Sequence, residues 1–153
     1  MTTTTRRLAI LLKFRELLQG ISLADGFATD AGENVYLQER PQLGKDDPDI
    51  AIAILVQDDE PKWQQEHVFV TLPIEIQALA KADITEPWIA AEQVLGDIKK
   101  AMEIEDRTLG RLVKRAIERG TTRTIARDAG ATTVGIAITY NAPYAEVWGG
   151  PQL

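Results

Sequence analysis

The sequence predicts an α+β fold, a single domain over residues 1–153 with an antiparallel or mixed sheet of about five strands and helices packed on one face. Apolar residues recur every three or four positions in some segments and every second position in others, which gives the order α-β-β-β-α-α-β-β. With 44% apolar and 26% charged residues, the chain of 153 residues has the composition of one globular domain with a sizeable core.

Helical spacing first appears over residues 5–19. Gly20 follows, at the C-terminal position where a helix favours a residue that tolerates a positive φ. The clearest helix is predicted in "ITEPWIAAEQVLGDIKKAMEI", with Thr85 as its cap and Trp88 at the start of an apolar stripe that faces the core. A shorter helix is expected roughly over residues 107–119.

Strands are predicted where apolar residues alternate. The strand at 50–56 is apolar on both faces, so we expect both of its faces to be covered. A longer strand begins near Glu66, and Pro73 within it marks an edge, a bulge or a break, because proline has no N–H to donate. We expect this strand to reach past the domain body as an arm. The other strands are expected at 33–40, 122–128 and 132–140, the last two as a hairpin around "DAGA".

Charge is distributed unevenly along the chain. The net charge of −6 argues against a protein whose main task is to grip nucleic acid. Acidic residues concentrate at 45–60 and basic residues at 107–127, and such opposite-signed surfaces can meet in self-assembly; the alternative is that both are ordinary solvated faces. The chain has no cysteine, which excludes disulfides and thiolate chemistry, and its longest wholly apolar run is too short to cross a membrane.

The stretch "DPDIAIAILVQDDEPK" fits the spacing of a class of magnesium-dependent nucleases, the PD-(D/E)xK pattern. That hypothesis needs Asp49 and Glu60 to share the metal and Lys62 to polarise the phosphate or the water. Pro61 interrupts the pattern, and no strand signal covers residues 58–62. A buried strand between acidic turns is therefore the favoured interpretation, and the nuclease remains a remote alternative.

No other catalytic pattern stands out. His67 is the single histidine, and a lone histidine at the start of a strand is more often a surface or edge residue than a base or ligand. The acidic stretch lacks the spacing of a calcium-binding loop. We therefore expect a protein that is not an enzyme, with no catalytic residues, no cofactor and no metal site.

Two tryptophans are candidates for contacts with other proteins. Trp63 lies among charged residues and Trp148 lies in the tail "YAEVWGGPQL", so each either anchors an interface or folds back onto its own domain. Both interpretations stay open. The candidate residues for a subunit or partner interface are Trp63, Phe69, Arg115, Arg119, Arg123 and Trp148.

The element order, together with "PWIAAEQVLGDIKKAM", "DRTLGRLV" and "ATTVGIAITYNAPYAEVW", resembles the tail terminator (tail completion) proteins of long-tailed bacteriophages, the lambda-type minor tail family. The resemblance spans residues 8 to 148. It implies a structural protein that forms a homo-oligomeric ring, typically a hexamer, which caps the tail tube and ends its polymerisation.

The same resemblance implies the partners. They are further copies of the chain, the tail tube protein and a head-completion or stopper protein, with DNA passing through the lumen without specific binding. It also implies a place in the virion, at the head-proximal end of the tail, after assembly in the host cytoplasm. The alternative within the same class is another head–tail connector or a tail tube component. No membrane partner is expected.

Overall fold

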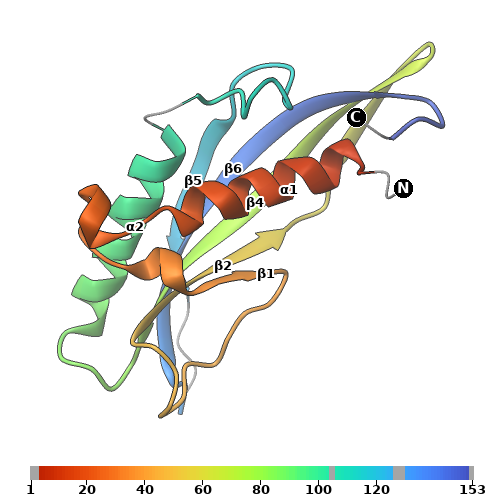
Figure 1. Ribbon diagram of the computed structural model, residues 1–153. Coiled ribbons are helices and arrows are strands. Elements are labelled where there is room, and N and C mark those ends of the chain that lie inside the picture. Colours follow the sequence, from red (N-terminus) through yellow and green to blue (C-terminus); the bar gives the residue numbers. More distant parts are fainter. Residues whose placement is uncertain (1–3, 104–105, 126–129, 152–153) are drawn as a thin grey trace.

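The computed structural model describes residues 4–103, 106–125 and 130–151. Within these ranges, two α-helices pack against a mixed sheet of six strands, which confirms the predicted α+β fold with one strand more than expected (Figure 1). The elements are α1 (Arg6–Gln19), β1 (Val35–Leu37), β2 (Ile50–Val56), β3 (Glu60–Gln64), β4 (His67–Lys81), α2 (Pro87–Glu103), β5 (Glu118–Thr124) and β6 (Thr133–Val147), with short 3-10 turns at Leu23–Asp25 and Ala31–Glu33.

The sheet has the order β1-β2-β4-β6-β5, and β3 pairs with β4 beyond the end of β2. Only the β1–β2 pair is parallel among these strands. The β4–β6 pair is the longest, with fifteen residue pairs from His67↔Val147 to Lys81↔Thr133. Strands β2 and β3 pair with its β4 side and β5 pairs with its β6 side, so this pair forms the centre of the sheet.

The main core lies between the helices and one face of the sheet. Alternate residues of β4, from Val68 to Ala80, face the helices and are buried, as strand geometry requires. On α1, the predicted apolar face is buried, and Phe14 packs edge-on against Tyr140 of β6 with ring centroids 6.5 Å apart. The periodicity of α1 was therefore sufficient to predict its buried face.

The ends of both helices differ from the prediction. Thr5 caps α1 by accepting from the Leu8 N–H, but Gly20 has φ −77°, so the expected positive φ is wrong. Its N–H instead bonds to the Leu17 carbonyl and the chain continues in a right-handed turn. Before α2, the residue that adopts a positive φ (54°) is Glu86, directly ahead of Pro87, so Thr85 lies one residue too early to be the cap.

The helix predicted at 107–119 is wrong. Leu109, Gly110 and Arg111 have φ values of 54°, 67° and 70°, which a right-handed helix does not allow. The Asp106 carboxylate accepts from the N–H groups of Thr108 and Gly110 and so folds the segment into turns. The chain then enters β5 at Glu118, four residues before the predicted strand, and part of the "DAGA" turn lies outside the described residues.

The opposite face of the sheet carries a second, smaller apolar cluster. The loop after β1 lays Leu43 over Ala51 and Ala53 of β2, which confirms that both faces of this strand are covered. Gly135 of β6 is needed here, because a Cβ atom would lie 2.8 Å from side-chain carbons of both Leu79 and Ile125. The helices therefore cover one face of the sheet, and a loop covers part of the other.

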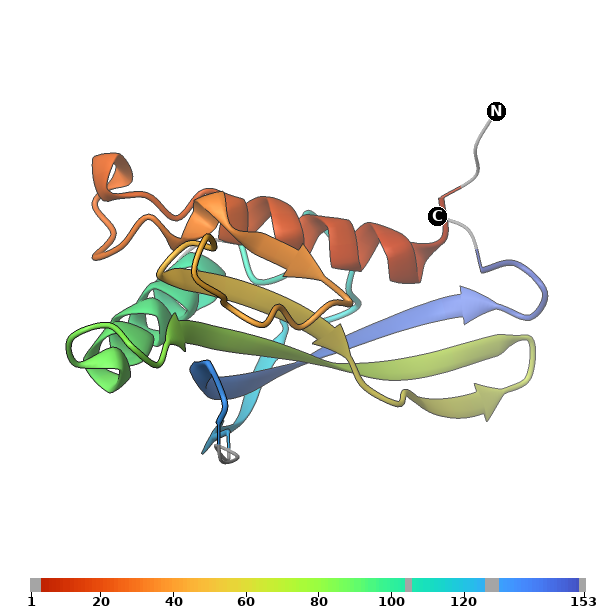
Figure 2. The same cartoon turned by 90° about the horizontal axis from the view of Figure 1, so that it is seen from below.

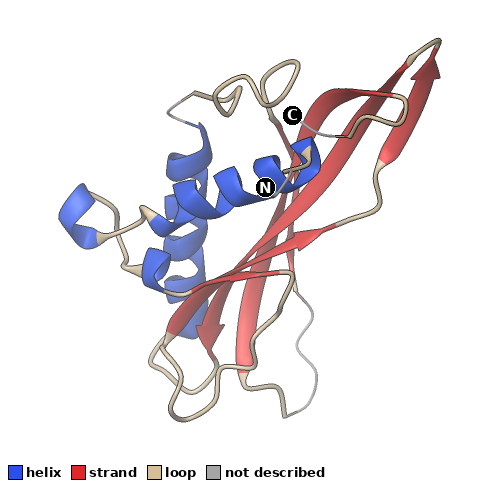
Figure 3. Ribbon diagram, turned by 45° about the vertical axis from the view of Figure 1, so that its right-hand side comes forward, coloured by secondary structure: helices blue, strands red, loops and turns tan. Residues whose placement is uncertain are grey.

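One end of the sheet projects past α1 as a three-stranded arm (Figures 2 and 3). We define the arm as β3 with residues 67–72 of β4 and 142–147 of β6, which pair continuously. Strand β3 was not predicted. Pro73 lies beside the break between the end of β2 and the start of β3, and its carbonyl accepts from Gln57 there, so its missing N–H costs no ladder bond. The predicted arm is confirmed. Strand β4 itself continues through Pro73 without a break, so the interruption lies between the neighbouring strands β2 and β3.

Candidate protein-interaction surfaces

The residues of the nuclease pattern are far apart. The backbone of Asp49 bonds to the N–H of Lys81 at one end of β4, whereas Glu60 pairs with Thr71. Lys81 and Thr71 are ten residues apart on β4, which is about 30 Å at the rise of a strand. Glu60 and Lys62 do share β3, contrary to the expectation that no strand covers them, but Asp49 cannot share a metal ion with Glu60.

Tryptophan side chains meet at the end of the arm. Trp63 on β3 and Trp148, just after β6, have ring centroids 4.4 Å apart at an interplanar angle of 60°. Trp148 is held there because its N–H bonds to the Glu66 carbonyl, over 2.8 Å, and because the chain turns back at Gly149, where φ is 77°. The geometry is the edge-to-face contact that aromatic rings favour.

The tryptophan pair stays largely exposed. Trp63 is 59% and Trp148 66% accessible, and Val147, the residue before Trp148, is 52% accessible. Together with Val68 and Pro151 they line a shallow apolar groove of about 410 Å³. The two rings thus contact each other, yet most of their apolar surface faces solvent, as expected of a surface that another protein covers. We call this surface the tryptophan tip.

The prediction that Trp88 belongs to the core is wrong. Trp88 is 39% exposed, because it lies in the first turn of α2, one turn before Ala91, the first buried residue of that helix. The apolar stripe is real, but it begins at Ala91.

A second groove lies beside β3, on the face of the arm without helices. It holds about 270 Å³ and is lined by Lys62, Gln64, Phe69, Val70, Thr71, Lys114, Arg115, Pro143 and Tyr144. Lys62 is the cross-strand neighbour of Phe69, and the Lys114 ammonium lies 3.9 Å from the centroid of the Phe69 ring. We call it the basic groove. Within the described part of the chain, none of its three cationic side chains forms an ion pair.

Arg119 and Arg123 are engaged inside the chain. Arg119 donates to the Glu103 carboxylate, which also accepts from the Tyr140 hydroxyl over 2.7 Å. Burial raises the pKa of Glu103, but the hydrogen bonds from Arg119 and Tyr140 outweigh it and hold that pKa below its ordinary value. Burial, and then the bond to Glu103, raise the pKa of Tyr140. Arg119 therefore fastens β5 and β6 to the end of α2.

Arg123 covers a buried polar pair on the other face of the sheet. It donates to Glu75 over 2.6 Å, and Gln77 donates to the second oxygen of the same carboxylate over 3.0 Å. Glu75 and Gln77 are only 7% and 2% exposed. Among the described residues, the Gln77 Oε1 atom has no hydrogen-bond partner. The contacts of Arg119 and Arg123 are thus intramolecular, and of the three arginines in the predicted interface set only Arg115 lacks an ion-pair partner within the described ranges.

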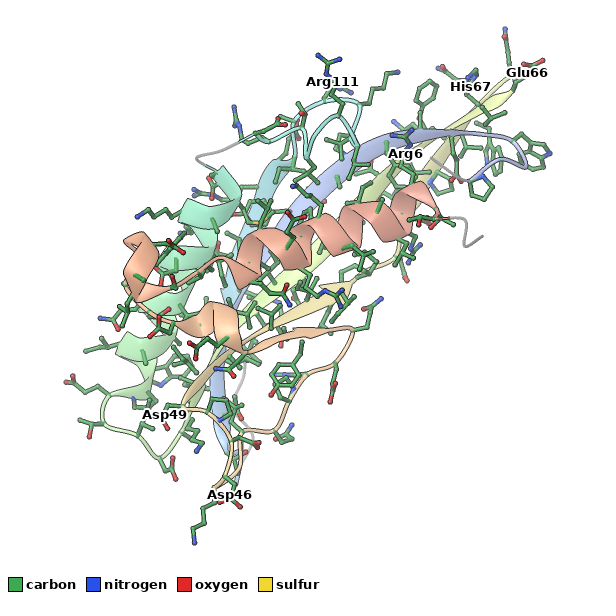
Figure 4. The ribbon with its side chains drawn as sticks, viewed as in Figure 1. Arg6, Asp46, Asp49, Glu66, His67 and Arg111 are labelled. Atoms are coloured by element: carbon green, nitrogen blue, oxygen red, sulfur yellow. The ribbon has the colours of Figure 1, made fainter. Side chains whose placement is uncertain are left out.

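The acidic stretch 45–60 is not one surface. Asp46 and Asp49 lie at one end of the molecule, and Glu66 and His67, at the arm tip, lie at the opposite end (Figure 4). Asp58, Asp59 and Glu60 lie instead at the base of β3, where Asp59 is 3.6 Å from Arg7. We call residues 45–49 the acidic turn. His67 is exposed on the arm and stacks near Phe69, with ring centroids 6.4 Å apart.

Sequence reasoning missed Lys62 and Lys114 as surface residues of one site. The signal that could have found Lys62 is its alternation with Glu60 and Gln64, which places the three on one face of a short strand. No local signal marks Lys114, because only the pairing of its backbone with Pro143 of β6 brings it to the arm.

No family model matches the chain, and no curated protein matches it. In the described part of the chain, no group of three or more histidine, aspartate or glutamate side chains is placed to hold a metal ion. None of the described helices is both long and apolar enough to span a membrane.

Proposed function

We propose that the protein is a structural component of a long-tailed bacteriophage, a tail terminator that assembles into a ring, caps the tail tube and presents the surface to which the head joins. The proposal starts from the resemblance in the sequence. The observation that carries it furthest is the tryptophan tip: an arm ending in two tryptophans that are 59% and 66% exposed.

The tip supports a role in assembly because exposed tryptophans are costly in a free protein and are frequent energetic anchors of interfaces. Its position adds to this, since an arm that projects past the helices can reach a neighbouring subunit or the tube end without moving the core. The body buries most of its apolar residues on both sides of the sheet, although Leu8, Leu23, Trp88 and Ile89 are also exposed there.

A tail tube component is the second candidate, and the edges of the sheet favour it. All residues of β3 and β5 are exposed, and each strand has a ladder partner on one side only. Such edges can pair with a strand of another copy, and repeated pairing would propagate as a polymer. A terminator closes a ring and stops, so the two candidates differ in the end product.

The test is the mass of the purified protein across a concentration series by light scattering, with negative-stain images of any large species. The proposal expects a closed ring of about six subunits that binds one end of purified tail tubes and blocks their further growth. Open tubes formed by the protein alone would favour the tail tube component. A protein that forms no ring and leaves tube growth unchanged would contradict the terminator.

A further inference from the structure

We propose that the acidic turn of one copy docks into the basic groove of the next copy, so that a head-to-tail ion-pair contact links subunits in the ring. This inference rests on the proposed function, since it names the contact by which copies would associate. Its occupant is a second copy of the same chain.

Unpaired charge is the first argument. Lys62, Lys114 and Arg115 converge on the basic groove, and the residues lining it include no carboxylate. Arg119 and Arg123, a few residues further along the chain, have carboxylate partners 2.5 and 2.6 Å away. The chain therefore neutralises one set of cations internally and leaves the other set open to a partner.

The acidic turn supplies complementary charge. Asp46, Asp47 and Asp49 are exposed, and the labelled Asp46 and Asp49 lie at one extremity of the molecule (Figure 4). Asp47 accepts from the Gly44 N–H, and among the described residues the one ion pair of the three aspartates is a 3.8 Å contact of Asp49 with Lys81. The turn and the groove are therefore opposite in sign.

The two surfaces cannot meet within one molecule. The acidic turn adjoins Lys81 and the groove adjoins Phe69, twelve residues apart along the same strand. At the rise of a strand that separation is about 40 Å. A contact between them therefore joins two copies. Where each copy uses its two patches on two different neighbours, the contact is heterologous and closes into a ring or continues as a filament.

Nucleic acid is the other polyanion that cationic side chains could hold, and the structure favours it less. A groove of about 270 Å³ accommodates one or two side chains rather than a duplex. The chain as a whole carries a net charge of −6, which repels a phosphate backbone.

The test uses two charge-reversed variants of the full chain. The groove variant is Lys114→Glu with Arg115→Glu. The turn variant is Asp46→Lys with Asp47→Asn, because asparagine keeps an oxygen that can accept from the Gly44 N–H. A matched control, Arg15→Glu with Arg40→Glu, makes the same change in net charge as the groove variant, on α1 and in the loop after β1. Neither position lines the groove, and among the described residues neither forms an ion pair.

The readout is the association constant from analytical ultracentrifugation at low and high salt. We expect each reversed variant alone to associate at least about tenfold more weakly than the wild type, as for close charge pairs in other interfaces. An equimolar mixture of the two variants should recover assembly, since each then offers the other a complementary surface, and the recovered rings should contain an even number of subunits. Salt should weaken the wild-type contact.

Three results would overturn the contact. One is wild-type protein that does not associate at low salt; another is a groove variant that associates like the Arg15→Glu, Arg40→Glu control. The third is retained association with loss of binding to duplex DNA, which would assign the groove to phosphate. In all three cases capping of tail tubes can still be measured, so failure of this contact is distinguishable from failure of the terminator function.

Discussion

Trp63 on β3 and Trp148, in the turn directly after β6, have ring centroids 4.4 Å apart, although β4 separates the two strands. Flanking strands of a sheet are separated by about 10 Å, so the contact depends on the side chains rather than the backbone. The contact requires β3, a strand that the polar composition of "EPKWQ" does not predict. It also requires the turn after Val147, which brings Trp148 back over the arm.

This contact predicts a spectroscopic signature. Two indole rings so close couple their electronic transitions, and we expect a pair of opposite-signed bands in the ultraviolet circular dichroism spectrum. Trp63→Phe or Trp148→Phe should abolish the pair, while Trp88→Phe should keep it, because Trp88 lies on α2. If all three variants retain the bands, the rings do not meet in solution.

Trp148→Ala is expected to weaken ring formation or binding to tube ends by about thirtyfold, the effect typical of an interface anchor. Its unfolding temperature should stay within about 2 °C of the wild type, because Trp148 is 66% exposed. Trp88→Ala is the matched control and should assemble normally. Light scattering measures the assembly. If Trp148→Ala assembles as well as the wild type, the tryptophan tip is not part of the interface.

The Glu103 site should make stability depend on acid. Glu103 has a folded-state pKa below its ordinary value of 4.5, so its contribution is fully present above pH 4.5 and is lost as the pH falls through the folded-state pKa. Glu103→Gln should therefore be less stable than the wild type at neutral pH, and the difference should shrink in acid. Urea unfolding of both proteins at a series of pH values measures the difference in their free energies of unfolding. A difference that does not change with pH would contradict the ionic contacts of Glu103.

Tyr140→Phe tests the same cluster from the other side. It removes the hydroxyl that donates to Glu103 over 2.7 Å, from a side chain only 1% exposed. We expect a loss of about 1 kcal/mol, which lowers the unfolding temperature by about 3 °C in a domain of this size. Tyr36→Phe is the control, since no hydrogen bond of the Tyr36 hydroxyl is recorded in the described part of the chain, and it should be close to neutral.

Asp97 should be a strong determinant of stability. This carboxylate on α2 is 4% exposed and accepts from the N–H groups of Ala28 and Thr29 and from the Thr29 hydroxyl. Asp97→Ala leaves these donors without a partner, so we expect a loss of about 3 kcal/mol and an unfolding temperature about 8 °C lower. Asp25→Ala, at an exposed carboxylate, should change stability by less than about 0.5 kcal/mol. Calorimetry that finds the two equal would contradict the assignment.

The elements predicted well are those whose pattern is long and unbroken. The fifteen residues of β4 and the seventeen of α2 each bury one continuous face, so period alone places them. The predicted helix at 107–119 had apolar spacing too, but the Asp106 carboxylate competes for its first N–H groups, and periodicity does not report such competition.

The candidate surfaces were predictable only in part. Trp63 and Trp148 stand out in the sequence as aromatic residues in polar surroundings, whereas their contact depends on strand register. Arg119 and Arg123 were expected at an interface, but Arg119 forms an ion pair with Glu103 and Arg123 with Glu75. These partners are distant in sequence, so no local pattern predicts the two ion pairs. Lys62 reaches the basic groove through the pairing of β3 with β4, and Lys114 through its backbone hydrogen bond to Pro143 of β6. The groove therefore exists only in the folded chain.

The continuity of β4 and β6 has a consequence for how the arm behaves under load. Both strands belong to the arm and to the body, so two unbroken strands, rather than a loop, join the arm to the body. Force applied at the tip by a docked partner is carried along fifteen paired residues to the strands beneath the helices. A subunit held at its tip is therefore oriented as a whole. In the proposed ring, such subunits would resist tilting at the joint between tail and head.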